Sequence, residues 1–335
     1  MTQIAPPELV VAARPRFNLS RVMTTFSDRP LVPLLILLAL LAVLFALLNP
    51  RASLDDWVAT SIRAAIPLAI IAAAQTITML TGGIDLSVAA TASMAGFVAA
   101  SLYTPGGGPW LGIAIAIGLA ILIGLINGIG VGVFRVHPLI MTLGMGLVIL
   151  GAANAWQLMT VRASTGVPPE LRWIGVTITF EFVAASLLVF VPLAIIVLLG
   201  LKRTGYGRLL YAIGDNPTAA RLSGVRSWQV LLILYILSAI LAAIAGFLIS
   251  GLNNVASVTL ATPYLLPSVA AAVIGGTSIL GGRGGYAGTI VGALILTVIT
   301  SLLSSLGYPE AVRQILFGAI IILVAAGYAR VTSSS

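Results

Sequence analysis

The sequence contains no cysteine, one histidine and one lysine among its 335 residues. Without cysteine, the chain cannot form disulfides, thiolate nucleophiles or sulfur-ligated metal sites. The single His137 excludes a histidine-rich metal site. A phosphate-binding loop is excluded because Arg203 follows Lys202, where that motif requires Ser or Thr. We therefore expect no metal, no cofactor and no catalytic residue, and we expect any large aqueous activity to lie on another chain.

Charge is also scarce. Charged residues make up 8% of the chain, hydrophobic residues make up 59%, and the mean hydropathy is +1.14. A soluble domain is about one quarter charged, so this composition indicates an integral membrane protein. We predict an all-α, polytopic membrane helix bundle with roughly ten transmembrane helices. The apolar runs lie at about 31–48, 64–81, 88–103, 111–134, 139–159, 182–201, 230–251, 264–281, 286–306 and 311–329.

The distribution of arginine and lysine predicts the orientation. With the N-terminus in the cytoplasm, twelve basic residues fall inside and five fall outside, which favours N-in and C-in. Residues 1–30 and 330–335 would then be cytoplasmic tails around one transmembrane domain over 31–329. The net charge of +8 is a topology signal on this interpretation. We expect contact with lipid headgroups and no nucleic-acid partner.

Small residues recur four apart in several of the apolar runs. Such spacing lets helix backbones approach closely in a membrane. Either packing within the bundle or a subunit interface would explain it. The longest row consists of Gly112, Ala116, Ala120, Gly124, Gly128 and Gly132.

Two glycine-rich breaks interrupt hydrophobic segments in separate halves of the chain. In transporters, such paired breaks are the best sequence indication of the translocation site. The first break also contains a carboxylate, which at membrane depth must face protein or water. Tight turns between helices are the alternative explanation. The candidate pathway or gate residues are Gly82, Gly83, Asp85 and Ser87 in the first break, and Gly275, Gly276, Thr277 and Ser278 in the second.

The segment 202–226 is the longest strongly charged internal loop, and the orientation places it in the cytoplasm. Asn216 suits an N-cap, Pro217 the first helical position and Gly224 the position after the end, so we predict a short capped helix over 216–223. A well-capped helix favours a docking element for a partner. The alternative is a connector whose arginines rest on anionic lipid, namely Arg208, Arg221 and Arg226.

Few polar side chains lie inside the apolar runs. Asn127, Asn154 and Gln157 are expected to hydrogen-bond between helices rather than to touch a substrate. No pair of oppositely charged residues lies within the runs. An ion-driven carrier that relies on a buried charge relay therefore lacks its usual parts.

Four segments together resemble a known family. They are Thr-Gly-Gly-Ile-Asp-Leu-Ser-Val at 81–88, Pro-Leu-Ile-Met-Thr-Leu-Gly at 138–144, the loop 205–225, and the glycine-rich segment 273–289. In order and spacing they resemble the permease subunit of ribose-type sugar importers of the ATP-binding-cassette superfamily. The likeness runs from about residue 31 to 329. Ala89 departs from the family, which commonly has glycine after Asp-Leu-Ser-Val, and this affects the expected close packing at the start of the third span.

The resemblance implies an inner-membrane permease that forms the pathway for a monosaccharide. It also implies three partners: a second permease chain, identical or not, a cytoplasmic ATP-binding subunit and an extracytoplasmic sugar-binding protein. Branched-chain amino acids, nucleosides or a signalling furanose are alternative substrates within the superfamily, and an ion-coupled carrier is an alternative outside it. The residues implied to couple to the ATP-binding subunit are Gly214, Asn216, Pro217, Ala219, Ala220, Arg221, Ser223 and Gly224.

Overall fold

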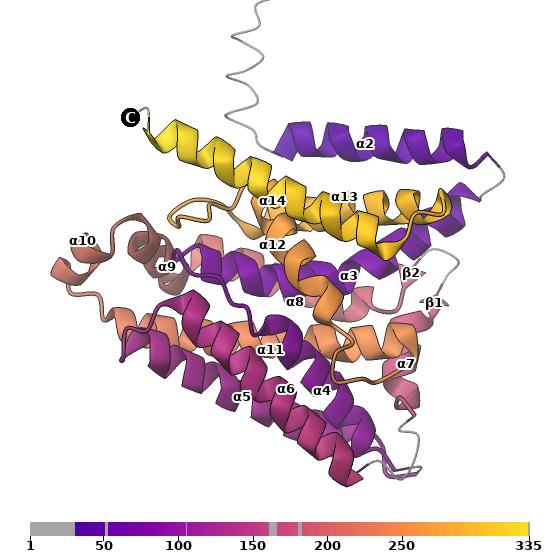
Figure 1. The fold of residues 1–335 in the computed structure, drawn as a ribbon, viewed down its shortest axis with the longest axis horizontal. Coiled ribbons are helices and arrows are strands. Elements are labelled where there is room, and N and C mark those ends of the chain that lie inside the picture. Colours follow the sequence, from indigo (N-terminus) through magenta and orange to yellow (C-terminus); the bar gives the residue numbers. More distant parts are fainter. Residues whose placement is uncertain (1–30, 51–52, 105, 161–165, 180–182, 334–335) are drawn as a thin grey trace, which may run out of the picture.

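The computed structural model describes residues 31–50, 53–104, 106–160, 166–179 and 183–333 (Figure 1). The predicted N-terminal tail over 1–30 lies outside these ranges. The described residues confirm an all-helical architecture, to which one two-residue antiparallel pair, β1 (Ile178–Thr179) and β2 (Val183–Ala184), is added. The longer helices are α2 (Leu31–Leu48), α3 (Leu54–Met79), α4 (Val88–Ser101), α5 (Trp110–Gly132), α6 (Pro138–Thr160), α8 (Leu187–Arg203), α9 (Gly205–Asp215), α11 (Ser227–Asn253), α12 (Leu265–Ile274), α13 (Tyr286–Ser305) and α14 (Glu310–Ser333). The shorter ones are α7 (Pro169–Val176), α10 (Pro217–Leu222) and the 3-10 turn η1 (Thr262–Tyr264).

Six helices are long and apolar enough to cross a membrane, or seven if the bent pair α8 and α9 forms one span. The predicted span over 88–103 is the 14-residue α4, and that over 264–281 ends as a helix at Ile274. At about 1.5 Å per residue, neither crosses a hydrocarbon core of about 30 Å. Helix α12 stops where Gly276 adopts a φ of +88°. At the C-terminal end, α14 continues through Ser333, beyond the predicted boundary at 329.

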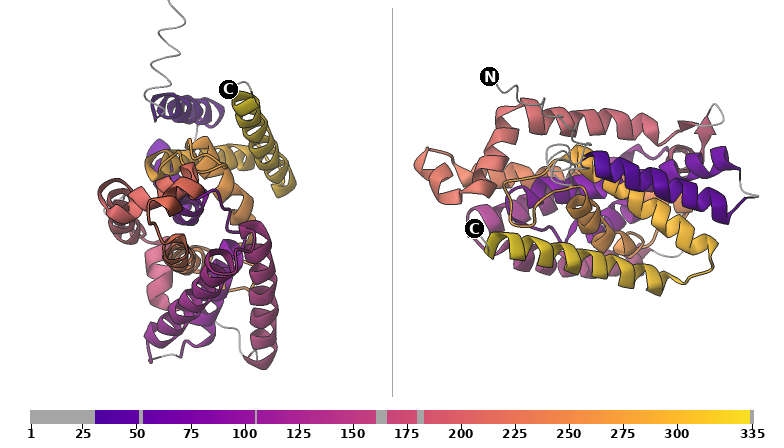
Figure 2. Two further views of the ribbon diagram at one scale, coloured as in Figure 1. Left: turned by 90° about the vertical axis from the view of Figure 1, so that its left-hand side faces the viewer. Right: turned by 90° about the horizontal axis from the view of Figure 1, so that it is seen from above.

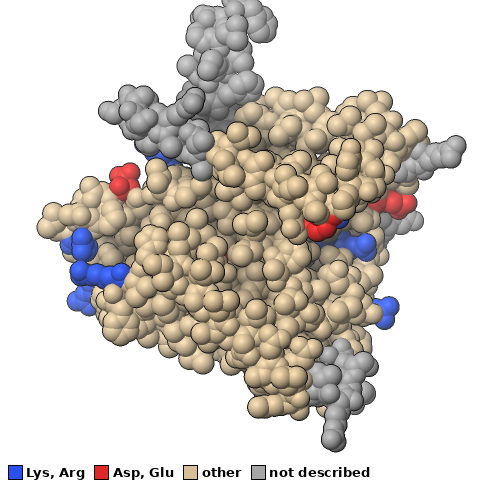
Figure 3. Space-filling model, in the orientation of Figure 1, with Lys and Arg blue, Asp and Glu red and all other residues tan. Residues whose placement is uncertain are grey.

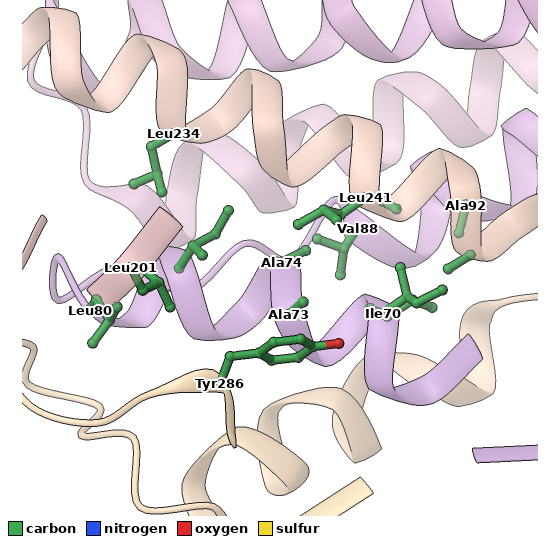
Figure 4. Packing of buried hydrophobic residues seen from close by; sticks show 14 of the residues in the cluster. Ile70, Ala73, Ala74, Leu80, Val88, Ala92, Leu201, Leu234, Leu241 and Tyr286 are labelled. Atoms are coloured by element: carbon green, nitrogen blue, oxygen red, sulfur yellow. The ribbon is translucent and has the colours of Figure 1, made fainter. Parts of the chain in front are cut away.

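Helices α3 and α11 form the centre of the bundle. Seventeen of the 26 residues of α3 and fifteen of the 27 residues of α11 are buried. Figure 4 shows how side chains from five helices meet there: Ile70, Ala73 and Ala74 from α3, Val88 and Ala92 from α4, Leu201 from α8, Leu234 and Leu241 from α11, and Tyr286 from α13. The phenol of Tyr286 also donates a hydrogen bond to the carbonyl of Ala69 at 3.1 Å. Alanines let the central helices approach closely, and the larger side chains fill the space between them.

The predicted row of small residues on α5 packs within the chain. A Cβ added at Gly124 would lie 2.5 Å from the Tyr235 carbonyl oxygen of α11. Added at Gly128, it would lie 2.7 Å from Leu232 Cα. Gly124, Gly128 and Gly132 therefore lie at the seam between α5 and α11, whereas Gly112 packs against Ala99 of α4. Such close packing is expected where lipid offers no hydrophobic drive.

Helices α2 and α14 lie at the outside of the bundle (Figures 1 and 2). In α2 only Phe45 is buried, and its ring stacks on Trp57 of α3 with the ring centroids 4.1 Å apart. The remaining leucines and valines of α2 are largely exposed. An apolar helix with so little contact suits a lipid-facing position.

Candidate functional site

The first glycine break, residues 80–87, connects α3 to α4 and encloses Asp85. This side chain is only 1% exposed, and both of its carboxylate oxygens accept hydrogen bonds. The Ser87 hydroxyl donates to Oδ1 at 2.6 Å, and the Ser238 hydroxyl of α11 donates to Oδ2 at 2.8 Å. The Asp85 carboxylate thus ties the break to the central helix α11. A buried carboxylate is tolerated when such donors replace water.

The backbone of this break is held from two further helices. The Gln75 side chain of α3 donates to the Asp85 carbonyl at 2.8 Å and accepts from the Asp85 amide at 3.3 Å. The Thr142 hydroxyl of α6 accepts from the Leu86 amide at 2.9 Å and lies 3.2 Å from the Ile84 carbonyl. Non-helical backbone at membrane depth requires partners of this kind.

The sequence did not single out Gln75, Thr142 or Ser238 as site residues. Ser238 and Gln75 each stand inside an apolar run. A polar side chain in the middle of an apolar run is the signal that could have found Gln75. The pairing of these residues with the break requires the three-dimensional structure, because Ser238 lies 153 residues from Asp85.

The intramembrane asparagines behave differently from each other. Asn127 of α5 is 1% exposed, and its Nδ2 donates to the Ser87 hydroxyl at 3.0 Å. This hydrogen bond joins two segments, as expected. Asn154 of α6 instead donates to Leu150 of its own helix at 2.8 Å and lies on an exposed face. The expectation of a bond between helices is therefore not met for Asn154.

The second break, residues 275–285, folds into a tight loop between α12 and α13. The Ser278 amide donates to the Arg283 carbonyl at 2.9 Å, and the Ser278 hydroxyl accepts from the Leu280 amide at 3.2 Å. Gly281 and Gly282 adopt φ values of +92° and +72°, which disfavour any residue with a side chain. Thr277 is fully buried, and among the described residues its hydroxyl has no hydrogen-bond partner.

The two breaks meet each other. The Gly282 amide donates to the Leu80 carbonyl at 3.0 Å, although about two hundred residues separate them. A Cβ added at Gly82 would lie 3.3 Å from the Leu280 carbonyl oxygen. The two breaks therefore lie against each other, with Leu80 and Gly82 on one side and Leu280 and Gly282 on the other.

The charged loop 202–226 contains more helix than predicted. Helix α8 bends by 66° into α9, which the sequence analysis did not anticipate, and α10 follows. The predicted capping is present: Asn216 Oδ1 accepts from the amides of Thr218 at 3.0 Å and Ala219 at 2.9 Å, and Gly224 has a φ of +85°. The helix occupies Pro217–Leu222, so it begins at the predicted first position and ends one residue before the predicted end.

The faces of α10 differ in exposure. Ala220 is buried at 6%, whereas Leu222 is 86% exposed. Asn216, Pro217, Ala219, Arg221, Ser223 and Gly224 are also exposed. The surface that α10 presents to an approaching partner therefore excludes Ala220, whose methyl group packs inward.

Helix α9 connects this loop to both breaks through glycine. A Cβ added at Gly214 would lie 2.5 Å from the Gly282 amide nitrogen and 2.9 Å from the Leu80 carbonyl carbon. The Tyr211 phenol of α9 also donates to the Gly284 carbonyl at 2.9 Å. We call the contact among Leu80, Gly214 and Gly282 the glycine junction. No side chain larger than hydrogen fits at its centre, so α9 packs directly on the backbone of both breaks.

The chemistry of this region is that of neutral hydrogen-bonding groups around one enclosed carboxylate. Among the described residues, no group of three His, Cys, Asp or Glu side chains could hold a metal ion. Hydroxyls, amides and glycine backbone suit transient binding and close packing.

Comparison with known proteins shows the family to which the chain belongs. The family described as the branched-chain amino acid transport system permease component matches residues 58–325. A fructose import permease protein of Rhizobium meliloti is 34% identical over 263 residues, which cover 77% of this chain and 73% of that protein. A ribose import permease protein of Escherichia coli K12 is 33% identical over 274 residues, covering 77% and 80% respectively.

A galactofuranose transporter permease protein of the same bacterium is 31% identical over 264 residues, covering 78% of this chain and 76% of that protein. No solved structure matches the chain. The family match spans most of the sequence and includes both glycine breaks and the loop 202–226. The chain therefore belongs to this family of membrane permease components, and it is a transport subunit, not an enzyme.

Proposed function

We propose that this chain forms the translocation pathway for a monosaccharide in an ATP-binding-cassette importer of the bacterial inner membrane. The similar fructose, ribose and galactofuranose permeases support the substrate class. The glycine junction carries the mechanistic part of the proposal, because it joins the charged loop to both breaks. ATP hydrolysis then takes place on a partner subunit, and the permease performs no covalent chemistry.

In this mechanism the ATP-binding subunit docks on the exposed face of α10. Leu222 is a large apolar side chain at 86% exposure on a short capped helix, and exposed apolar anchors are typical centres of protein interfaces. Closure of the ATP-binding domains would move α10 and α9 as one unit. The glycine junction would then shift the breaks between inward-facing and outward-facing arrangements.

Within the site, we propose different roles for the candidate residues. Gly82, Gly83, Gly275 and Gly276 allow the backbone to bend and to approach neighbouring segments. Asp85 and Ser87 hold the first break in place, because their polar groups are engaged with each other and with α11. Thr277 and Ser278 belong to the second break and form the opposite part of the gate.

We further propose that the pathway lies between two permease chains and is lined by α6. One face of α6 is exposed and includes Leu143, Leu147 and Asn154. A Cβ added at Gly144 or Gly151 would meet nothing within 4 Å. An amide among apolar and small residues suits weak contacts with a passing sugar better than it suits lipid. An extracytoplasmic sugar-binding protein would supply the affinity.

The proposed orientation places both ends of the described chain in the cytoplasm. In Figure 1 the end of α14 and α10 lie toward the left-hand side, and α2 begins at the end of the helix that is nearer to that side. Basic side chains gather over that side in Figure 3. This distribution follows the excess of arginine and lysine expected on cytoplasmic surfaces.

Reconstitution tests the proposal. The chain would be inserted into liposomes with its candidate ATP-binding subunit and binding protein, and ATP hydrolysis would be measured against pentoses, hexoses and branched-chain amino acids. Stimulation by one monosaccharide is the expected result. Stimulation by amino acids alone would favour the second candidate substrate class, which the description of the matching family names. Failure of the ATP-binding subunit to assemble would contradict the importer proposal.

A further inference from the structure

A cavity of about 680 Å³ lies beside the glycine junction, and the proposed transport cycle does not use it. It is formed by the end of α5, the connection to α6, the end of α9, α10 and the start of α11. Thr81 and Ile213 separate it from the junction. Three arginines line it, namely Arg135, Arg221 and Arg226, and no acidic residue does.

These arginines have no counter-ion within the described chain. The described salt bridge joins Arg313 to Glu310, and no hydrogen bond from the side chains of Arg135, Arg221 or Arg226 is found among the described residues. All three arginines are also exposed to solvent, and together they give the cavity a positive potential that attracts an anion. Their arrangement therefore points to a negatively charged ligand with several acceptor oxygens.

The start of α11 provides further donors at the same place. Arg226 is the N-cap of this 27-residue helix, and no side chain caps it. The hydroxyl of Ser227, which also lines the cavity, is buried without a hydrogen-bond partner in the described structure. The Ser227 and Gln229 amides already donate to Val225 and Arg226, so the unused donor here is the Ser227 hydroxyl. A hydroxyl beside the positive end of a helix suits a phosphate group.

Arg135 occupies a backbone position that favours glycine. Its φ is +56°, in the left-handed region, directly after the end of α5. The Val136 amide closes the turn by donating to the Gly130 carbonyl at 3.0 Å. Glycine is the usual residue at such a helix end. We infer that arginine replaces glycine at this position because its guanidinium group lines the cavity.

The rest of the lining identifies the ligand as a lipid. Val133 and Trp228 line the cavity and are also 50% and 45% exposed, so apolar surface continues from the cavity to the outside of α5 and α11. Both side chains lie at the ends of helices that qualify as membrane spans, where headgroups meet acyl chains. In Figure 3 the basic side chains at the left cover this end of the molecule.

We propose that this cavity binds the phosphate headgroup of an anionic phospholipid, with the acyl chains lying against Val133 and Trp228. Basic pockets between membrane helices hold such headgroups. The proposal goes beyond the transport function and does not depend on which substrate is carried. A bound lipid would contact both α10 and α11 and would thereby stabilise the position of α10, on which the ATP-binding subunit is proposed to dock.

The test is native mass spectrometry of the purified full-length chain with phosphatidylglycerol or phosphatidylcholine. The variant combines Arg135→Gly, Arg221→Gln and Arg226→Gln. The matched control combines Lys202→Gln, Arg203→Gln and Arg208→Gln, which removes the same charge outside the cavity. We expect the parent and the control to retain phosphatidylglycerol over phosphatidylcholine. The cavity variant should bind it on the order of tenfold or more weakly, because each basic residue contributes to headgroup affinity.

Folding is checked with the single Arg135→Gly variant, which places the favoured residue in the left-handed position. It should elute as the parent does on size exclusion and still bind phosphatidylglycerol more weakly. Equal retention by the cavity variant and the parent would overturn the proposal. Inorganic phosphate that competes as effectively as phosphatidylglycerol vesicles would assign a free anion instead. A cavity variant that keeps the lipid but loses the ATP-binding subunit would assign the arginines to the protein partner.

Discussion

The hydroxyl of Ser238 donates a hydrogen bond to the Oδ2 atom of Asp85 at 2.8 Å, which links the middle of α11 to the break between α3 and α4. The other oxygen of the same carboxylate is occupied by Ser87. Asp85 therefore acts within the structure as a bridge between two segments. Removal of either donor leaves part of a buried carboxylate without its partner, and this costs free energy.

Replacing Ser238 with alanine tests this bridge. We expect Ser238→Ala to lower the free energy of unfolding by about 1–3 kcal/mol, because one buried carboxylate oxygen loses its donor. Thermal unfolding of the purified protein measures the effect. Ser250→Ala serves as a control, since Ser250 is also buried in α11 and is not bonded to Asp85. Equal changes in the free energy of unfolding of the two variants would show that the hydrogen bond to Asp85 adds no measurable stability.

Replacing Asp85 with asparagine distinguishes a role in stabilising the first break from a role in transport. One oxygen becomes an NH₂ group that faces a hydroxyl donor, so we expect lower thermal stability together with slower uptake. Uptake into proteoliposomes and thermal unfolding are measured on the same preparation. Slower uptake at unchanged stability would place the carboxylate in the pathway itself. Uptake equal to that of the parent would leave Asp85 as a turn residue.

Replacing Gly214 with alanine tests the glycine junction. The added methyl group would collide with the backbone of Leu80 and Gly282, so α9 must move away from both breaks. We expect the ATP-binding subunit still to co-purify, while substrate-stimulated hydrolysis falls on the order of tenfold as the coupling between sites is lost. Gly200→Ala is the matched control, because a Cβ there meets nothing within 4 Å. Full stimulation in Gly214→Ala would contradict the proposed route.

Replacing Leu222 with glutamate tests the docking face of α10. A charge at the centre of an apolar contact should cost about 2 kcal/mol or more of binding free energy, so co-purification of the ATP-binding subunit should be lost. Val255→Glu is the control, since Val255 is an exposed aliphatic residue in the connection between α11 and η1. Ala220 is unsuitable for this test because it is buried, and a glutamate there would disturb α10 itself.

The proposed position of α6 along a pathway between two chains can be tested by cross-linking, because the natural chain contains no cysteine. Gly151→Cys introduces one thiol on the exposed face of α6. If the α6 helices of two copies face each other across the pathway, oxidation should give a covalent dimer when the pathway closes and the Cα atoms approach to roughly 4.4–6.8 Å. Leu37→Cys on the exposed α2 is the control and should remain monomeric. Dimer formation by the control alone would move the interface to α2.

The sequence predicted local features with the most success. Asn216, Pro217 and Gly224 define a short helix because capping is a property of neighbouring residues, and the structure places α10 within one residue of the prediction. The number of crossings was harder to predict. Hydropathy alone does not distinguish a full span from a half-helix such as α4 or α12, whose lengths depend on where the neighbouring breaks fold back.

The sequence by itself determined the class of this protein, since so little charge in so apolar a chain leaves only a membrane helix bundle. It also marked the two breaks, because glycine and a carboxylate stand out among apolar residues. Only the tertiary structure decided that these breaks meet at Gly214, that Asp85 is enclosed by Ser87 and Ser238, and that three arginines surround one cavity. The reason is physical: these contacts join residues far apart in the chain, and helix packing rather than local propensity sets their distance.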